Sequence, residues 1–250
     1  MPGFVDHQWI LRPIAAINAA LLRRQVADPA LRERLRPTDE VGCKRLLVSN
    51  DWYPTFTRPN VELVTDGIAQ VTPTSIIGTD GVEREVDVII FGTGFNANGF
   101  VAPMQVTGRD GLRLADAWDP LPQAYLGTAV SGFPNLFMLY GPNTNLGHNS
   151  ITFMLERQIE YTVKAIGEMH ARNLAAMELK QSAQDRFNKE LQAGLAKTTW
   201  ADPHCHSWYK NAKGHITQNW SSHTRDYAEG VKNVKWEDYT VRERKPMAAE

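Results

Sequence analysis

The sequence has few cysteines, almost no net charge and no long apolar run. Cys43 and Cys205 are its only cysteines. They are too few for a disulfide framework and fit a reducing compartment, although the sequence leaves a single bridge open. The 27 basic and 28 acidic side chains give a net charge of -1, which makes nucleic acid and anionic membranes poor partner candidates. The most apolar early stretch, residues 14–22, is too short to span a bilayer. We therefore expect a cytoplasmic protein without a membrane span.

The chain also lacks internal repeats and low-complexity segments, and its composition is that of a soluble globular protein. Helical periodicity predicts helices over 8–26 and 151–169, where Ile151, Leu155, Ile159, Val163 and Ile166 form one stripe. A short helix should start at Asp28-Pro29, with Asp28 as N-cap. Another should start at Ser182, with Asp185 as capping partner and Phe187, Leu191 and Leu195 as its apolar stripe.

Between Lys44 and Phe95 the periodicity changes to that of strands. Residues 46–48 and 61–64 are typical of strands, and Gly78-Thr-Asp-Gly81 predicts a hairpin turn. A further strand is predicted over 135–140, stopped by Gly141-Pro-Asn143.

A short apolar run that ends in glycines is the most informative part of this region. The run consists of Val86, Val88, Ile89, Ile90 and Phe91, and its β-branched side chains favour a buried parallel strand. The run ends in Gly92-Thr93-Gly94, where the backbone can approach a flat or phosphorylated ligand closely. Such an ending is one edge of a dinucleotide site, and the other edge should be a Gly-x-Gly-x-x-Gly turn. The 250 residues contain no such turn, so we expect part of a cofactor enzyme rather than all of one.

Three further groups could carry chemistry. Lys44 and Arg45, at the start of a predicted strand, could stabilise an anion that develops during reaction, or be ordinary solvated charges. The small and polar residues 141–150 form a strand-loop-helix junction that could hold an anionic ring or phosphate, or be an ordinary capped connection.

The third group is the segment 200–209. Its His204, Cys205 and His206 match no common zinc spacing, so packing and hydrogen bonding are favoured over a metal site. Trp208 and Tyr209 could line an apolar substrate pocket or belong to the core.

Taken in order, these motifs resemble those of class B flavin monooxygenases. Within that class the chain is most similar to Baeyer–Villiger monooxygenases of the 4-hydroxyacetophenone and cyclohexanone types. The resemblance runs from about residue 1 to the tryptophan-rich tail, and the motifs that carry it are Gly42-Cys-Lys-Arg45, Asp87-Val-Ile-Ile-Phe-Gly-Thr-Gly-Phe95, Tyr125-Leu-Gly-Thr128, Gly132-Phe-Pro-Asn-Leu-Phe137 and Gly141-Pro-Asn-Thr-Asn145.

The resemblance implies an α/β fold, the C-terminal portion of a flavoprotein with two dinucleotide-binding domains. Residues 1–88 would be the C-terminal part of the NADP-binding domain, with a helical segment. Residues 89–250 would be the C-terminal part of the FAD-binding domain, with the substrate and control loop. The implied cofactors are FAD and NADPH. The implied reaction inserts oxygen from O2 into a small apolar ketone to give an ester or lactone, or oxygenates sulfur or nitrogen.

The same resemblance assigns roles by position. Arg45 matches the arginine that stabilises the peroxyflavin anion, with Lys44 as its neighbour in the cofactor cleft. The glycine motif beside FAD corresponds to Gly92, Thr93 and Gly94. The loop near the isoalloxazine corresponds to Asn143, Thr144, Asn145 and Leu146, and the tryptophan of the loop that closes over NADP and substrate corresponds to Trp208.

The sequence departs from the family in what it lacks. The family's FAD-binding Gly-x-Gly-x-x-Gly turn, its second glycine-rich turn and its Phe-x-Gly-x-x-x-His-x-x-x-Trp signature normally precede the matched region, and none occurs in these residues. We therefore expect one wall of the flavin site without its pyrophosphate cradle, and weak FAD binding by the chain alone. The alternatives are a split enzyme with a separate N-terminal FAD-binding polypeptide and a non-catalytic fragment.

Overall fold

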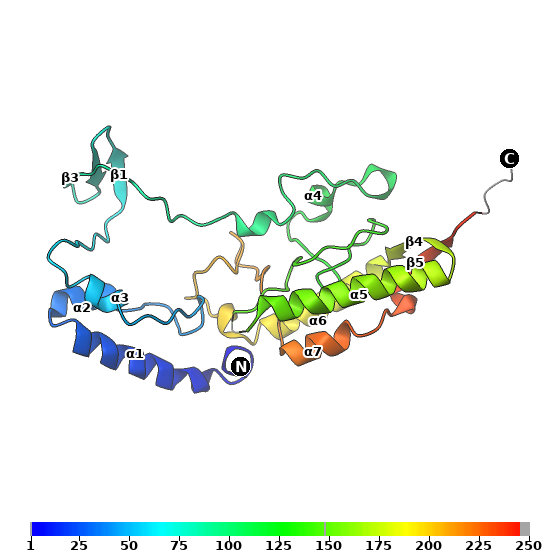
Figure 1. The fold of residues 1–250 in the computed structure, drawn as a ribbon, viewed down its shortest axis with the longest axis horizontal. Helices are drawn as coiled ribbons and strands as arrows, with labels where there is room; N and C mark the ends of the chain where they lie inside the picture. The colour runs from blue at the N-terminus through cyan, green and yellow to red at the C-terminus, as the bar shows by residue number, and fades with distance from the viewer. Residues whose placement is uncertain (1, 148, 246–250) are drawn as a thin grey trace. The chain divides into compact units, whose positions relative to one another are not determined.

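The protein's structure, a computed structural model, describes residues 2–147 and 149–245, which form two compact units (Figure 1). The first unit comprises residues 1–13, 39–46 and 97–250, and the second comprises 14–38 and 47–96. The units therefore interleave along the sequence. The predicted boundary between residues 88 and 89 separates an NADP-binding part from an FAD-binding part. It does not coincide with the division into these two units, and it stays a prediction.

The second unit holds most of α1 (Arg12–Gln25), together with α2 (Pro29–Leu35) and α3 (Trp52–Thr55). The predicted cap of α2 is confirmed, because an Asp28 side-chain oxygen accepts a hydrogen bond from the Ala30 amide at 2.9 Å. These helices share a small core of Leu22, Val26 and Tyr53, with Leu31 and Leu35 packed against it.

The second unit also contains a small antiparallel sheet in the order β1 (Ile68–Val71), β2 (Ser75–Gly78) and β3 (Glu83–Glu85). The predicted turn at 78–81 is confirmed, since it joins β2 to β3. The turn is reinforced by Arg84, which pairs with Asp80 at 2.9 Å.

The predicted parallel strand over residues 86–91 is wrong for this chain. β3 ends at Glu85, and among the described residues no backbone hydrogen bond involves residues 87–95. Ile90 is 90% exposed and Phe91 81% exposed. A strand that is apolar on both faces is stable only when neighbours pair its backbone and cover both faces, and no described segment does so. For the same reason the strands predicted over 46–48 and 61–64 do not form, and Val48 is fully exposed at 100%.

The strand predicted over 135–140 also does not form. Asn135 and Tyr140 both have positive φ, at 59° and 60°, which is incompatible with an extended strand. Asn135 instead bonds to β4 (Leu174–Leu179): its amide donates to the Met177 carbonyl at 3.0 Å, and its side-chain oxygen accepts from the Met177 amide at 3.0 Å.

The first unit is built around α5 (Ile151–Ala171), α6 (Gln181–Leu195) and α7 (Thr224–Gly230), together with β4 and β5 (Tyr239–Glu243). β4 and β5 pair antiparallel, and α5 packs against both β4 and α7 (Figure 1). The shorter elements are α4 (Leu114–Ala117) and the 3-10 turns Pro2–Phe4, Gln8–Leu11, Ala97–Gly99, Arg109–Gly111, Thr199–Ala201 and Trp236–Asp238.

The existence of α5 and α6 is confirmed, but most of the predicted apolar stripe of α5 is not its buried face. The buried residues are Met154, Gln158, Tyr161 and Ala165. Of the stripe, Ile151 packs against the core, whereas Ile159, Val163 and Ile166 are exposed. Two of the four buried residues, Gln158 and Tyr161, are polar, and each has a hydrogen-bond partner there. One example is the Gln158 side-chain oxygen, which accepts from the Tyr140 amide at 2.9 Å.

In α6 the predicted stripe is confirmed, since Leu191 and Leu195 are buried and Phe187 packs against the same core. The predicted Ser182 cap is wrong. Lys180 occupies the N-cap position, and Asp185 accepts instead from the Gln181 side-chain amide at 2.8 Å.

Four buried tyrosines form the polar centre of the first unit. The Tyr125 hydroxyl donates to Asp238 at 2.7 Å, and the Tyr161 and Tyr239 hydroxyls share a 2.7 Å hydrogen bond. The Tyr227 hydroxyl donates to the Leu126 carbonyl at 2.7 Å.

No helix in the described part of the chain has the length and apolar character needed to cross a membrane.

Candidate functional site

The segment that carries Arg45, residues 39–46, belongs to the first unit although the residues on either side of it belong to the second. The two adjacent cations of this segment differ in their surroundings. The Lys44 ammonium pairs with the Asp39 carboxylate at 2.6 Å. Arg45 is exposed and makes no ion pair or hydrogen bond within the described residues. Its charge is therefore available to a ligand.

Two phenols that sequence reasoning did not connect with Arg45 lie within reach of its charge. Burial raises the pKa of Tyr140, and the positive charge of Arg45 opposes that rise. The pKa of Tyr209 is likewise raised by burial and lowered by Arg45. The charge of Arg45 thus acts on one tyrosine that precedes the 141–146 loop and on one that follows Trp208.

The loop Asn143–Leu146 is buried and bonded to residues 216–219. The Asn143 amide donates to the Thr217 carbonyl at 2.9 Å, and the Asn145 amide donates to the Gln218 carbonyl at 2.8 Å. The side-chain amide of Asn143 donates to the carbonyls of Ile216 and Asn219 at 2.9 and 3.1 Å. These bonds fix the shape of the loop from a segment more than seventy positions away, so no local sequence signal could have shown them.

Within the loop, the remaining side chains also bond to protein groups. The Thr144 hydroxyl donates to the Gly141 carbonyl at 2.7 Å. Asn145 accepts from the Tyr140 hydroxyl at 2.9 Å and donates to Asn219 at 2.5 Å. Asn143, Thr144 and Asn145 therefore hold the loop in place with their side chains. The bond between Asn145 and Tyr140 connects the loop to a phenol on which the charge of Arg45 acts. Contact of these residues with a flavin ring stays a prediction.

The shape of this loop depends on Gly127, and we expect Gly127→Ala to destabilise the fold. Gly127 has φ +67°, and a Cβ there would lie 2.0 Å from the Thr144 side chain. Backbone strain and overpacking together should lower the free energy of unfolding by about 2–3 kcal/mol in urea denaturation. Gly214→Ala is the matched control, because Gly214 has φ +81° but open space around a Cβ. Equal losses in the two variants would show that Thr144 does not confine this position.

After the loop, α5 begins at Ile151 with Ser150 at the N-cap position. The Ser150 side chain makes no capping hydrogen bond, and among the described residues Asn149 accepts only from the Ser150 amide, at 2.8 Å. The first turn of this 21-residue helix therefore keeps amides without a side-chain cap, with the partial positive charge that suits an anionic group. His148, in the same junction, lies outside the described residues.

The segment that contains Trp208 is joined covalently to the arginine segment. Cys43 and Cys205, both buried, form a disulfide with 5.4 Å between their Cα atoms, so the bridge that the sequence left open is present. Trp208 is 46% exposed, and its ring lies 4.5 Å from that of Tyr209.

No three His, Cys, Asp or Glu side chains of the described residues gather to hold a metal ion.

Gly92, Thr93 and Gly94 lie in the second unit, in the exposed extended segment after β3. A Cβ added at Gly92 or Gly94 would meet nothing within 4 Å, so these glycines form no cradle around a ligand with the described residues. The fit to the implied cofactors is therefore partial. The first unit offers an unpaired cation, an exposed indole and an uncapped helix start for a flavin or nicotinamide ring, but no described segment would hold a pyrophosphate.

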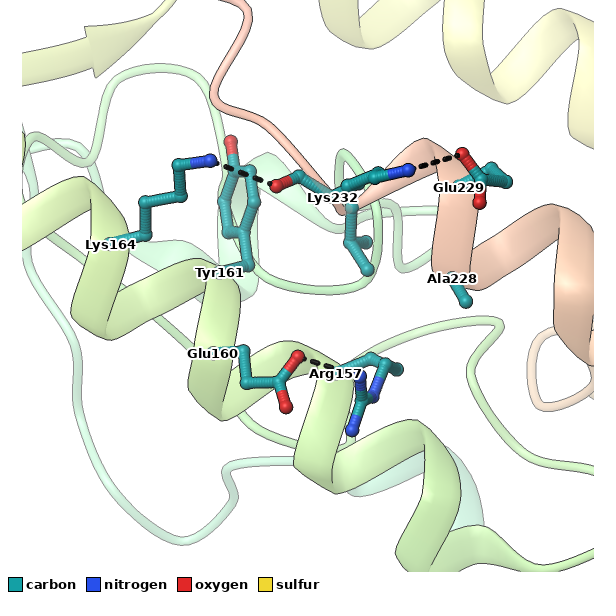
Figure 2. A pocket seen from close by; sticks show the side chains of 8 residues that line it. Arg157, Glu160, Tyr161, Lys164, Ala228, Glu229 and Lys232 are labelled. Atoms are coloured by element: carbon teal, nitrogen blue, oxygen red, sulfur yellow. Dashed lines mark hydrogen bonds and ion pairs between the residues drawn. The ribbon is translucent and has the colours of Figure 1, made fainter.

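A separate cavity of about 290 Å³ lies between α5 and α7 and is lined by none of the predicted site residues (Figure 2). Its charged groups bond to one another or to neighbouring protein groups. Arg157 pairs with Glu160 at 2.8 Å, Lys232 pairs with Glu229 at 3.4 Å, and Lys164 donates to the Lys232 carbonyl at 3.2 Å (Figure 2). We assign this cavity no part in the candidate site.

Comparison with known proteins identifies relatives over most of the chain. A Baeyer–Villiger monooxygenase of Pseudomonas aeruginosa is 43% identical over 207 residues, which are 83% of this chain and 39% of that protein. One of Streptomyces coelicolor is 34% identical over 96% of this chain and 46% of that protein. The chain thus spans less than half the length of these relatives. No family model matches it.

Solved structures give the same result. Cyclohexanone monooxygenase from Rhodococcus sp. Phi1, bound to NADP+, superposes with a TM-score of 0.87 at 25% identity, over 97% of this chain and 47% of that one. A steroid monooxygenase bound to NADP gives a TM-score of 0.85 at 27% identity, over 97% and 47%. In sequence and in fold, the chain corresponds to the C-terminal part of the FAD- and NADP-binding monooxygenases of the Baeyer–Villiger type.

Proposed function

We propose that this chain, together with a part that carries the FAD-binding glycine turn, catalyses the NADPH- and O2-dependent oxygenation of a small apolar ketone. The product would be an ester or lactone, and sulfur or nitrogen compounds are alternative substrates. The observation that carries the proposal is the unpaired Arg45, whose charge acts on Tyr140, the tyrosine that bonds to the buried 141–146 loop. It is made in a chain that is similar to Baeyer–Villiger monooxygenases over most of its length. When bound, the flavin supplies the electrons that activate O2.

In this proposal Arg45 stabilises negative charge that develops at the reacting centre. A guanidinium is always charged and offers several donors in one plane, and Arg45 has no competing carboxylate among the described residues. Lys44 contributes less charge because Asp39 already pairs with it. Trp208, half exposed next to Tyr209, covers the nicotinamide and the substrate and limits access of water.

We further propose that the FAD-binding part is a separate N-terminal polypeptide or domain that covers the exposed apolar surfaces. In the second unit these are formed by Leu47, Val48, Val88, Ile90, Phe91 and Phe95. In the first unit they are formed by Ile159, Val163 and Ile166 on the outer face of α5. Large apolar side chains that stay this exposed are typical of surfaces that another part of a protein covers. The alternative is a non-catalytic fragment, for which the same exposure would mean poor solubility.

The test is to co-express the chain with the N-terminal portion of the Pseudomonas aeruginosa relative that this chain does not match. We expect the pair to purify yellow, with bound FAD, and to oxidise NADPH faster when a ketone is added, with an ester or lactone as product. The chain alone should be colourless. Stoichiometric flavin on the chain alone would contradict the need for a second part. A compact, flavin-loaded pair without ketone-dependent NADPH oxidation would contradict the proposed reaction.

We propose the cytoplasm as the location, because the proposed reaction consumes NADPH, an intracellular reductant. Fractionation of the producing cells, followed by immunodetection of the chain, tests this; recovery in an extracytoplasmic fraction would contradict it.

A further inference from the structure

The Cys43–Cys205 disulfide lies next to the two residues with the most prominent proposed roles. Cys43 precedes Arg45 by two positions, and Cys205 precedes Trp208 by three. The two cysteines are 162 positions apart in the sequence, and both sulfurs lie in the core of the first unit. The bridge therefore ties the arginine segment directly to the segment that carries the tryptophan.

Few other interactions hold the chain near Arg45. On the N-terminal side, the Trp200 indole donates to the Gly42 carbonyl at 3.0 Å, and the Phe4 ring lies so close that a Cβ at Gly42 would be 2.6 Å from it. After Cys43 the anchoring stops. Within the part of the chain that the structure describes, residues 44–48 make no backbone hydrogen bond, and the Lys44 side chain pairs only with Asp39 of the same segment. The position of Arg45 therefore depends on what fixes Cys43.

We propose that the Cys43–Cys205 disulfide is a positioning element of the site, which holds Arg45 against the Trp208 segment and releases it when a cellular dithiol reduces the bridge. This inference rests on the proposed function for the meaning of the site, whereas the effect of the bridge on the two segments can be measured without it. Cys43 and Cys205 touch no reacting atom in this proposal, and they act through Arg45 and Trp208.

The reduction is an ordinary thiol–disulfide exchange. One thiolate of the dithiol attacks Cys43 or Cys205, the S–S bond breaks, and a mixed disulfide forms. The second thiol of the reductant resolves it. Two electrons and two protons end on Cys43 and Cys205, and the dithiol leaves as a disulfide. Because both cysteines are at most 1% exposed, the attack requires local opening, so we expect reduction to be slow in the native protein.

The first test uses the full chain, oxidised or treated with dithiothreitol, and the variants Cys43→Ser, Cys205→Ser and the double variant. Alkylation and intact-mass measurement should find no free thiol before reduction and two after it. Hydrogen exchange should then accelerate by about tenfold or more at the hydrogen-bonded amides of Cys43, Cys205 and Lys210, with α5 and β4 unchanged. The two single variants and the double variant should show the same acceleration, since each removes one shared bond.

Leu195→Ala is the control, because it truncates a buried side chain of the same core and leaves both cysteines in place. It should lower global stability without a selective change at the amides of Cys43, Cys205 and Lys210. The proposal would be overturned by free thiols in the chain as purified, by unchanged exchange after verified reduction, or by an acceleration spread evenly over the chain.

A second readout connects the bridge to the site. In the flavin-loaded pair, dithiothreitol should lower kcat with the ketone by about tenfold, and oxidised glutathione should restore it. The double serine variant should have the lower kcat throughout and respond to neither reagent. If the pair has no ketone-dependent activity at all, the proposed function fails, and the hydrogen-exchange result still decides the role of the bridge. A kcat that does not change with the state of the bridge would overturn the positioning role.

Discussion

Arg45→Ala is expected to lower kcat/KM for the ketone by about 10²–10³-fold in the flavin-loaded pair, the loss typical of removing one stabilising donor from an active site. Arg45 is exposed and free of ion pairs within the described residues, so its removal should leave the fold intact and remove only a charge that no described carboxylate neutralises. Steady-state NADPH oxidation with and without the ketone measures the loss. Circular dichroism and flavin content verify that the variant is folded and loaded.

The matched control is Lys44→Ala, at the neighbouring position. Lys44 is paired with Asp39 at 2.6 Å, so we expect its loss to change kcat/KM by about threefold or less. Arg45→Lys keeps the charge but loses the planar set of donors, and should fall between the two. Equal effects of Arg45→Ala and Lys44→Ala would show that the segment supplies only diffuse positive charge. An Arg45→Ala variant with full activity would remove Arg45 from the proposed chemistry.

Stability is expected to fall steeply above pH 10 because of the tyrosines buried in the first unit. Burial raises the pKa of Tyr161 to about 12, and it raises the pKa of Tyr125, Tyr227 and Tyr239 further. The nearby Asp238 contributes to the rise for Tyr125, and the Tyr161 side chain contributes to it for Tyr239. In the unfolded chain these phenols ionise near their ordinary pKa of 10.0.

The sign follows from proton binding. Above pH 10 the unfolded chain loses phenolic protons that the folded chain keeps, so the folded state binds more protons and raising the pH favours unfolding. The stabilisation is complete below pH 10 and is lost as the pH rises towards the folded-state pKa. Each of the four tyrosines contributes up to about 1.4 kcal/mol per pH unit in that window.

The measurement is urea denaturation at a series of alkaline pH values, together with phenolate absorbance and far-ultraviolet circular dichroism. At least four of the seven tyrosines, Tyr125, Tyr161, Tyr227 and Tyr239, should ionise only as the helical signal is lost. Tyr161→Phe should reduce the number of coupled tyrosines by one, although Tyr239 then loses its hydrogen-bond partner. Ionisation of all seven tyrosines in a protein that keeps its full helical signal would contradict the expectation.

What the sequence predicted well is local. The Asp28 cap, the turn at 78–81 and the existence of α5 and α6 depend on residues a few positions apart, and each was confirmed. What it predicted badly depends on distant partners. The run 86–91 has the composition of a buried strand, but a strand forms only where another segment pairs with it. β4 and β5 lie some sixty residues apart in the sequence, so no turn motif between them predicts that they pair.

In the candidate site, too, local motifs were predictable from the sequence and long-range contacts were not. The motif around Arg45 and the polar loop at 143–146 are visible in sequence, and the resemblance named them. The link from Tyr140 to Asn145, the bonds from residues 216–219 and the bridge between Cys43 and Cys205 are not visible, because each joins positions that only the folded chain brings together. Hydrophobic periodicity also misled for α5, whose buried face includes the hydrogen-bonded Gln158 and Tyr161.

The interleaving of the two units has a consequence for how this chain can be divided or exchanged. The chain passes from one unit to the other after residues 13, 38, 46 and 96. No single cut can therefore separate the units, and a gene exchange that replaces residues 14–96 as one block would carry Arg45 and Cys43 with it. The eight-residue segment 39–46 folds as part of the first unit, but in such an exchange it would come from the same parent as the second unit. A recombinant in which the two blocks come from different relatives would have to match this segment to Cys205 and to the Trp208 region, or lose the disulfide that joins them.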